Sequence, residues 1–259
     1  MLVFVLLLFS IILYFFFLLK NRKKNSLIKN LFFLFFLISL SVFIKAYCFE
    51  LISVKSISME TTFHDGDLIL INKLAYGPRS IESFFDIPWI GPLTTHILKR
   101  VEEKKYSTPT ARVFYNNDIN KGDIVIFEHY YNNSYLIKRC VGVPGDTVFL
   151  NNFSNSYQEY DSQITRNEIE DFIIVPVQGI PYHIDDDFYY NFREVIIRFE
   201  GEELLKRAGQ YYLNGEPATS YSFSRNYMFV VGDNRRFSID SRTFGVIPYD
   251  LIIGKAISF

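Results

Sequence analysis

Two polar residues in apolar or turn-like surroundings could do chemistry together. Ser58 lies in the stretch 56–63. Lys138 lies in the segment 135–143, where period-2 alternation puts it on the same strand face as the apolar Leu136 and Cys140. A serine hydroxyl is a poor nucleophile near neutral pH and needs an adjacent base. Because a lysine with apolar neighbours loses hydration of its charged form, its pKa falls from about 10.4, and its neutral amine could accept the serine proton. The competing interpretation is a strand lysine whose amine reaches solvent.

Other catalytic groups are less convincing. The four histidines lie in turn-like or loop-like surroundings without an accompanying motif: His64, His96, His129 and His183. The two cysteines cannot form a disulfide framework, and no CxxC or His/Cys spacing is typical of a zinc site. We therefore expect no Ser-His-Asp triad, no metal and no other cofactor.

A second polar group lies near the end of the chain. Ser238, Asp240 and Arg242 are two residues apart and would share one face of an extended segment. This spacing permits a hydroxyl to orient an amine while a carboxylate and a guanidinium pair behind it. The alternative is a polar turn that ends a strand.

The elements that must position these groups are mostly strands. From Leu51 onward, short β-branched and aromatic runs alternate with Gly-Asp, Pro-Gly and Asn-Gly turns, which predicts a mostly antiparallel β-sheet. The clearest runs are 68–71, 124–127, 147–150, 211–213 and 227–231. One helix is predicted over 188–208 from apolar residues at near-helical spacing, although Gly201 interrupts it.

Two stretches have no assigned role. Residues 151–210 carry no recognisable motif and are treated as an insertion. Residues 78–112 are rich in proline and contain Phe84, Phe85, Trp89 and Ile90. They form either a β-excursion that covers part of the core or an aromatic lip on lipid headgroups.

Two apolar stretches precede this domain. Residues 1–19 carry no charge, and at about 1.5 Å per residue they nearly match a hydrocarbon core of about 30 Å. Residues 31–49 carry one charge, Lys45, near one end, where its stem can snorkel. We predict two transmembrane helices. The alternatives are a cleaved signal peptide for the first stretch and a buried core helix for the second.

The charges predict the orientation of these helices. The 259 residues hold 27 basic and 28 acidic side chains, but residues 1–49 hold six basic and no acidic ones. Residues 50–259 therefore have 27 − 6 = 21 basic against 28 acidic, a balance that argues against nucleic-acid binding. The connector 20–30 carries five basic residues, as cytoplasmic loops do. Residues 50–259 would then form one extracytoplasmic domain.

Four segments occur in order behind the predicted spans. They are Ser-Ile-Ser-Met-Glu-Thr-Thr-Phe at 56–63, Gly-Asp-Leu-Ile-Leu-Ile-Asn-Lys at 66–73, Ile-Lys-Arg-Cys-Val-Gly-Val-Pro-Gly-Asp at 137–146 and Gly-Asp-Asn-Arg-Arg-Phe-Ser-Ile-Asp-Ser-Arg at 232–242. In order and spacing they resemble the type I signal peptidases, membrane-bound serine proteases that remove signal peptides from exported proteins. The resemblance covers both predicted spans and most of 50–150 and 211–259.

The resemblance implies roles for single residues. Ser58 would be the nucleophile and Lys138 the general base, while Ser56 and the Ser58 amide would form the oxyanion hole, unless Ser56 is an ordinary turn hydroxyl. Ser238 would hydrogen-bond the lysine, and Asp240 with Arg242 would support the site.

Neighbouring residues would serve the architecture. We expect Arg139 to be a structural ion-pair partner, because an always-charged side chain aimed into the site would add little. Most of 232–236 is interpreted as architecture as well.

The resemblance also implies a fold and a location. The fold would be an antiparallel signal-peptidase-like β-domain that follows two N-terminal membrane helices, and the protein would be a multi-pass protein of the cytoplasmic membrane. The catalytic domain would lie on the outer side, with preprotein signal peptides as substrates, the lipid bilayer as surroundings and the secretion translocon nearby. The substrate would add a strand to the sheet and carry small residues at the first and third positions before the cut.

This sequence departs from the family at three positions. Thr61 stands where proline is usual, Ile57 where many members have glycine, and Cys140 replaces a small apolar residue. None of these changes removes a reactive group. They leave open a degenerate, non-catalytic tethered β-module that binds envelope peptides or partners. A self-cleaving repressor relative is remote, because the chain has no DNA-binding segment.

Overall fold

The computed structural model describes residues 11–12, 26–80, 111–114, 118–129, 134–150 and 172–257. Almost all of the predicted first span, residues 20–25 of the basic loop and residues 151–171 of the insertion lie outside these ranges. Phe84, Phe85, Trp89 and Ile90 of the predicted lip also lie outside them.

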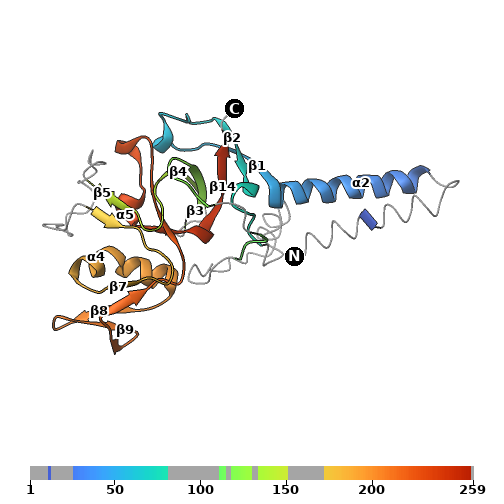
Figure 1. The fold of residues 1–259 in the computed structure, drawn as a ribbon. Coiled ribbons are helices and arrows are strands. Elements are labelled where there is room, and N and C mark those ends of the chain that lie inside the picture. Colours follow the sequence, from blue (N-terminus) through green and yellow to red (C-terminus); the bar gives the residue numbers. More distant parts are fainter. Residues whose placement is uncertain are drawn as a thin grey trace, which may run out of the picture.

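A long apolar helix leads into the sheet. Helix α2 (Ser26–Phe43) continues as a π-helical turn, η1 (Ile44–Cys48), and strand β1 (Phe49–Ser53) follows directly. The helical stretch Asn30–Cys48 is long and apolar enough to cross a membrane, and only 6% of it is buried. Such exposure excludes the core-helix alternative for 31–49. Figure 1 shows α2 extending away from the sheet, with β1 and β2 at its end.

One antiparallel sheet joins strands from both ends of the chain. Its order is β1-β2-β14-β3-β4-β12-β13, formed by β1 (Phe49–Ser53), β2 (Leu68–Asn72), β14 (Ile252–Ile257), β3 (Ile124–Glu128), β4 (Tyr135–Gly142), β12 (Tyr227–Val231) and β13 (Ile247–Pro248). Neighbours pair antiparallel throughout, which confirms the predicted mostly antiparallel β-sheet. Buried β-branched and aromatic residues on these strands form the core.

Short helical turns and three small sheets complete the described part of the fold. The turns are η2 (Ile57–Met59), η3 (Lys73–Ala75), η7 (Arg235–Phe237), α5 (Ser241–Phe244) and η8 (Tyr249–Leu251). The small sheets pair β5 (Thr147–Phe149) with β6 (Phe172–Ile174), β7 (Pro181–His183) with β11 (Ser220–Ser222), and β9 (Gln210–Leu213) with both β8 (Leu204–Arg207) and β10 (Glu216–Pro217). Asn214 and Gly215 adopt positive φ between β9 and β10, as tight hairpin turns require.

The predicted helix over 188–208 is right in its first part and wrong in its last. Helix α4 (Asp186–Val195) begins at the cap Asp185, whose side chain accepts from the Phe188 amide, and continues through a π-helical turn, η6 (Ile196–Glu200). Gly201 then adopts φ 74°, a left-handed conformation that ends helices. The residues beyond it form strand β8, because they pair with β9.

Residues 172–223, which we call the α4 lobe, lie at the end of the molecule away from α2 (Figure 1). The lobe has an aromatic core in which Phe223 packs against Tyr182, Phe188, Phe192 and Tyr221. This core continues into the main sheet through buried side chains of β12. The lobe therefore fixes β12, the strand that precedes the segment 232–242.

Candidate active site

Ser58 lies in a short 3-10 turn that follows β1. The turn begins at Ser56, whose hydroxyl accepts a hydrogen bond from the Ser58 amide at 3.2 Å. Met59 and Phe63 are buried in the core and anchor the turn. Ser58 itself is 6% exposed, so its hydroxyl faces the interior of the domain rather than bulk water.

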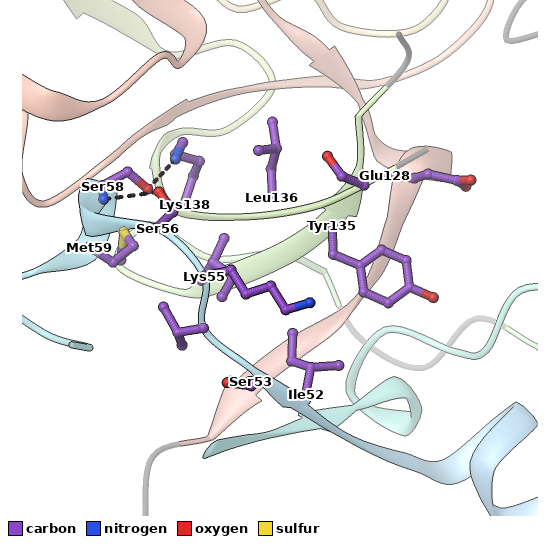
Figure 2. A pocket seen from close by; sticks show the side chains of 13 residues that line it. Ile52, Ser53, Lys55, Ser56, Ser58, Met59, Glu128, Tyr135, Leu136 and Lys138 are labelled. Carbon is purple, nitrogen blue, oxygen red and sulfur yellow. Dashed lines mark hydrogen bonds between the residues drawn. The ribbon is translucent and has the colours of Figure 1, made fainter. Parts of the chain in front are cut away.

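Lys138 lies in the middle of β4, opposite Val125 of β3. Its side chain is almost completely buried, with 2% of its surface exposed, so the snorkelling interpretation is wrong. Its Nζ lies 2.6 Å from the Ser58 Oγ and forms a hydrogen bond with it (Figure 2). The structure thus brings together two predicted site residues that are 80 positions apart in the chain.

The surroundings of Lys138 favour its neutral form. Burial is the main cause that lowers the pKa of Lys138, to about 8, from an ordinary value of 10.5. The Asp240 and Asp233 carboxylates oppose the shift, and the Arg242 guanidinium adds to it. At pH 7 roughly one amine in ten is then neutral, which is enough for a general base.

Asp240 is the centre of the second polar group. It is fully buried and accepts from the Ser238 hydroxyl at 2.6 Å, the Gly232 amide at 2.9 Å and the Arg242 guanidinium at 2.8 and 2.9 Å. The predicted pairing of Asp240 with Arg242 is therefore present. The expected hydrogen bond between Ser238 and Lys138 is not among the contacts of the described residues. The Ser238 hydroxyl instead donates to the charged Asp240 carboxylate.

Arg242 also differs from the predicted extended pattern. Asp240 caps the helical turn α5 by accepting from the Arg242 amide, so Arg242 lies on that turn and not on an extended face. Its guanidinium still reaches back to Asp240 and to the Arg235 carbonyl. Side-chain length, rather than strand alternation, brings the pair together.

The segment 232–234 holds the Ser58 turn, a role that the sequence interpretation missed. The Asn234 amide donates to the Ser58 carbonyl at 3.0 Å, and its side-chain amide donates to the Ile57 carbonyl at 2.9 Å. Gly232 is needed where it stands, since a Cβ there would lie 2.1 Å from the Ser238 Oγ and 2.6 Å from the Ser58 carbonyl oxygen. A polar turn directly after a buried strand was the signal that could have suggested this contact.

Arg139 and Asp233 tie this segment to β4. Arg139 donates to both carboxylate oxygens of Asp233, at 2.8 and 2.6 Å, which confirms its predicted structural ion pair. Asp233 also accepts from the Thr62 hydroxyl in the turn after Ser58. Arg139 and Thr62 hold the pKa of the Asp233 carboxyl below its usual range despite burial. The ion pair therefore fixes the candidate nucleophile relative to the strand that carries Lys138.

A groove of about 770 Å³ opens beside the dyad. It is lined by Ile52, Ser53, Val54, Lys55, Ser56, Ser58, Met59, Glu128, Ser134, Tyr135, Leu136, Ile137 and Lys138. Figure 2 shows the segment 52–56 on one side and β4 on the other, with Ser58 and Lys138 at one end. β12 pairs with β4 only from Arg139 onward, and β1 pairs only with β2 in the described sheet. In the described sheet, β1 is therefore paired along one edge only, with β2, and residues 135–138 are paired along one edge only, with β3.

Other chemistries lack support in the part of the chain that the structure describes. Cys140 is fully buried, and burial raises the pKa of its thiol to about 12, so it behaves as a small core side chain. No histidine lines the groove, and His96 lies outside the described residues. No group of three His, Cys, Asp or Glu side chains could hold a metal ion there.

Comparisons with known proteins identify the family of this chain. The family model described as signal peptidase, peptidase S26, matches residues 24–259. The chain belongs to this signal peptidase family. Signal peptidase I of Buchnera aphidicola from Acyrthosiphon pisum is 27% identical over 252 residues, covering 86% of this chain and 72% of that protein. Signal peptidase I of Aquifex aeolicus is 27% identical over 257 residues, covering 88% and 82%. That of Rickettsia typhi is 29% identical over 232 residues, covering 85% and 75%.

Proposed function

We propose that this protein is a membrane-bound serine endopeptidase that removes signal peptides from exported preproteins, with Ser58 as nucleophile and Lys138 as general base. The observation that carries the proposal is the 2.6 Å contact between the Lys138 Nζ and the Ser58 Oγ, with both side chains buried. A structural lysine would gain more from a carboxylate partner, whereas an amine facing a hydroxyl suits proton transfer.

The reaction follows from this contact. Ser58 Oγ attacks the scissile carbonyl carbon and its proton passes to the neutral Lys138 amine, which gives a tetrahedral intermediate. The Lys138 ammonium then protonates the leaving amine as the peptide C–N bond breaks, and an ester to Ser58 remains. Water attacks this ester while Lys138 accepts a water proton. The Lys138 ammonium then returns that proton to the Ser58 oxygen as the carboxylic acid leaves.

The oxyanion would be held by the Ser58 amide and the Ser56 hydroxyl. In the free protein the amide donates to the Ser56 oxygen at 3.2 Å, so the two groups already lie together. Ser56 is exposed at the groove, which leaves its hydroxyl free to rotate and donate to a bound carbonyl oxygen. Such a donor is worth about 2.7–4 kcal/mol in acyl transfer.

The supporting group would keep this geometry fixed. Asp240, held by Arg242, fixes the Ser238 hydroxyl beside the Ser58 backbone and adds a negative charge near Lys138. That charge stabilises the lysine ammonium that forms in the transition state. Ser238, Asp240 and Arg242 would therefore act as positioning residues without contact to substrate.

The substrate would bind as an added strand. The free edges of β1 and of 135–138 both line the groove, and an extended peptide can hydrogen-bond to each. Alternate side chains of such a strand face the same wall, so the first and third residues before the cut would face the apolar side chains of Val54, Met59 and Ile137. The preference for small residues at these two positions rests on the resemblance to the signal peptidase family.

We place the domain at the membrane surface. Phe49, Leu51, Leu68 and Ile257 are exposed on one face of the β1–β2–β14 part of the sheet, next to the end of the apolar helix. An exposed apolar patch continuous with an anchor suits contact with lipid. Two spans with the basic loop 20–30 inside would put 50–259 on the outer side of the cytoplasmic membrane, near the secretion translocon.

A cleavage assay tests this function. Detergent-solubilised protein is incubated with a preprotein that ends its signal peptide in Ala-x-Ala, and mass spectrometry identifies the new N-terminus. Ser58→Ala and Lys138→Ala should abolish cleavage. Ser53→Ala is the matched control, because Ser53 also lines the groove but its hydroxyl is bonded to the Gly66 carbonyl. Full activity of Ser58→Ala would contradict the proposal, and substrate binding without turnover by the wild type would favour the non-catalytic module.

A further inference from the structure

The anchor helix and the catalytic groove are joined without a linker. The helix ends at Cys48, and Phe49 already has extended backbone angles as the first residue of β1. The chain leaves β1 at Ser53 and forms one wall of the groove up to Ser58. Ten positions therefore separate the last helical residue from the candidate nucleophile.

A buried lysine from another segment, Lys73, holds this junction together. Lys73 follows β2 and has 8% of its surface exposed. Its Nζ donates to the Lys45 carbonyl at 2.7 Å and to the Ala46 carbonyl at 3.5 Å, and forms an ion pair with Glu50 at 2.9 Å. Carbonyls in the last turn of a helix lack intrahelical donors, and a cation is favourable there. Lys73 thus links the end of the helix, β1 and β2.

We propose that Lys73 is a positioning residue that clamps the membrane helix to the catalytic sheet, so that the enzyme selects its scissile bond by height above the bilayer. This inference rests on the proposed function. Because the clamp fixes both the helix end and the start of β1, the helix cannot swivel at the junction between Cys48 and Phe49. The groove then has one height and one orientation relative to the membrane.

A fixed height matters because the substrate is anchored in the same bilayer by its own apolar segment. An extended chain advances about 3.3 Å per residue, so two added residues move a scissile bond by about 7 Å. A rigid enzyme cuts well only where that bond meets Ser58. An enzyme that swivels would accept several heights, each less efficiently.

The test uses preproteins in liposomes with zero to six residues inserted between the apolar segment and the Ala-x-Ala site. The wild type should prefer one spacer length, with kcat/KM at least tenfold lower four residues away. Lys73→Met should flatten this preference to less than threefold while cleaving a soluble peptide within twofold of wild type. Lys73→Arg, which keeps a donor, should partly restore the preference. Lys45→Met is the matched control, since it removes a cation 3.8 Å from the same Glu50 but leaves the backbone carbonyls in place.

Two results would overturn the clamp. They are a spacer preference in Lys73→Met equal to that of the wild type, and no preference in the wild type. If Lys73→Met does not fold, insertion of Gly-Ser-Gly between Cys48 and Phe49 breaks the same junction, and an unchanged preference in that variant overturns the inference equally. Failure of the proposed function differs from all of these, because the wild type would then cleave neither soluble nor membrane-bound substrate, and the clamp would fall with it.

Discussion

The groove and the α4 lobe bury different kinds of side chain. Around the dyad the domain buries Ser58, Lys138, Ser238 and Asp240, all polar or charged. The α4 lobe instead buries aromatic rings, with Phe223 at their centre. Burial of a charged group lowers the stability of the folded state, whereas burial of an aromatic ring raises it. The difference indicates that the groove gives up stability for chemistry, while the lobe supplies stability to the strand that supports the site.

The largest expected effect is at Lys138. Lys138→Met should lower kcat/KM by a factor on the order of 10^4–10^6, as loss of a dyad member does. The same variant should be more stable at pH 7, by up to about 3 kcal/mol, because burial lowers the pKa of Lys138 from 10.5 to about 8. The unfolded state binds more protons between pH 8 and 10.5, so wild-type stability should rise through that window and the gain from methionine should shrink.

Chemical denaturation in detergent at pH 7 and pH 10 measures both effects on stability. Phe237→Ala, at an exposed position near the site, serves as a control for non-specific changes. If Lys138→Met lowered the free energy of unfolding at pH 7 as much as truncation of a buried ring in the α4 lobe does, the proposed difference between the two regions would be wrong.

The lobe should respond in the opposite way. Phe223→Ala removes a buried ring from a cluster of aromatic side chains and should lower the free energy of unfolding by about 3–5 kcal/mol. Cleavage per folded molecule should stay within about threefold of wild type, because no lobe residue lines the groove. A dye-based thermal shift and an active-site titration measure the two quantities. A large loss of kcat with unchanged stability would mean that the lobe takes part in catalysis.

Within the groove, Ser56 should matter less than the dyad. Ser56→Ala removes one proposed oxyanion donor and should lower kcat by about 10^2–10^3-fold with KM nearly unchanged. Ser56→Thr keeps the hydroxyl and should retain more activity. Steady-state kinetics on a peptide substrate separate the two parameters, and full activity of Ser56→Ala would reduce this hydroxyl to an ordinary turn cap.

The smallest effect is expected at Thr62. Thr62→Val removes its hydrogen bond to Asp233 while Arg139 still holds that carboxylate. A hydrogen bond of this kind contributes about 1–3 kcal/mol, and the partly exposed site lies at the low end. We expect kcat/KM to fall less than tenfold. An effect as large as that of Ser56→Ala would show that the turn depends on this contact more than on its buried anchors.

The sequence predicted the strands well because they leave local signals. Alternating and β-branched runs predicted β2, β3, β5, β9 and β12. For Lys138 the neighbouring residues left burial and exposure of its amine both open, and the structure shows it buried. The Ser58–Lys138 contact followed from the motif order rather than from any local pattern.

Long-range contacts were harder to predict. The helix over 188–208 was overextended because pairing with β9 overrides helical spacing beyond Gly201. The Ser238 hydroxyl donates to Asp240, and the spacing of 238, 240 and 242 did not distinguish this partner from Lys138. The contacts of Asn234 with the Ser58 turn and of Lys73 with the anchor helix join segments far apart in the chain, and their residue types are also common on solvated surfaces.

The pH profile of kcat/KM on a soluble peptide shows whether the buried Lys138, in its neutral form, activates Ser58. We expect kcat/KM to rise about tenfold per pH unit below an inflection near pH 8, the pKa of Lys138, and to level off above it. Ser58→Ala and Lys138→Met should show no such profile. An inflection near pH 6.5, typical of histidine, or a flat profile between pH 6 and 9 would contradict the account.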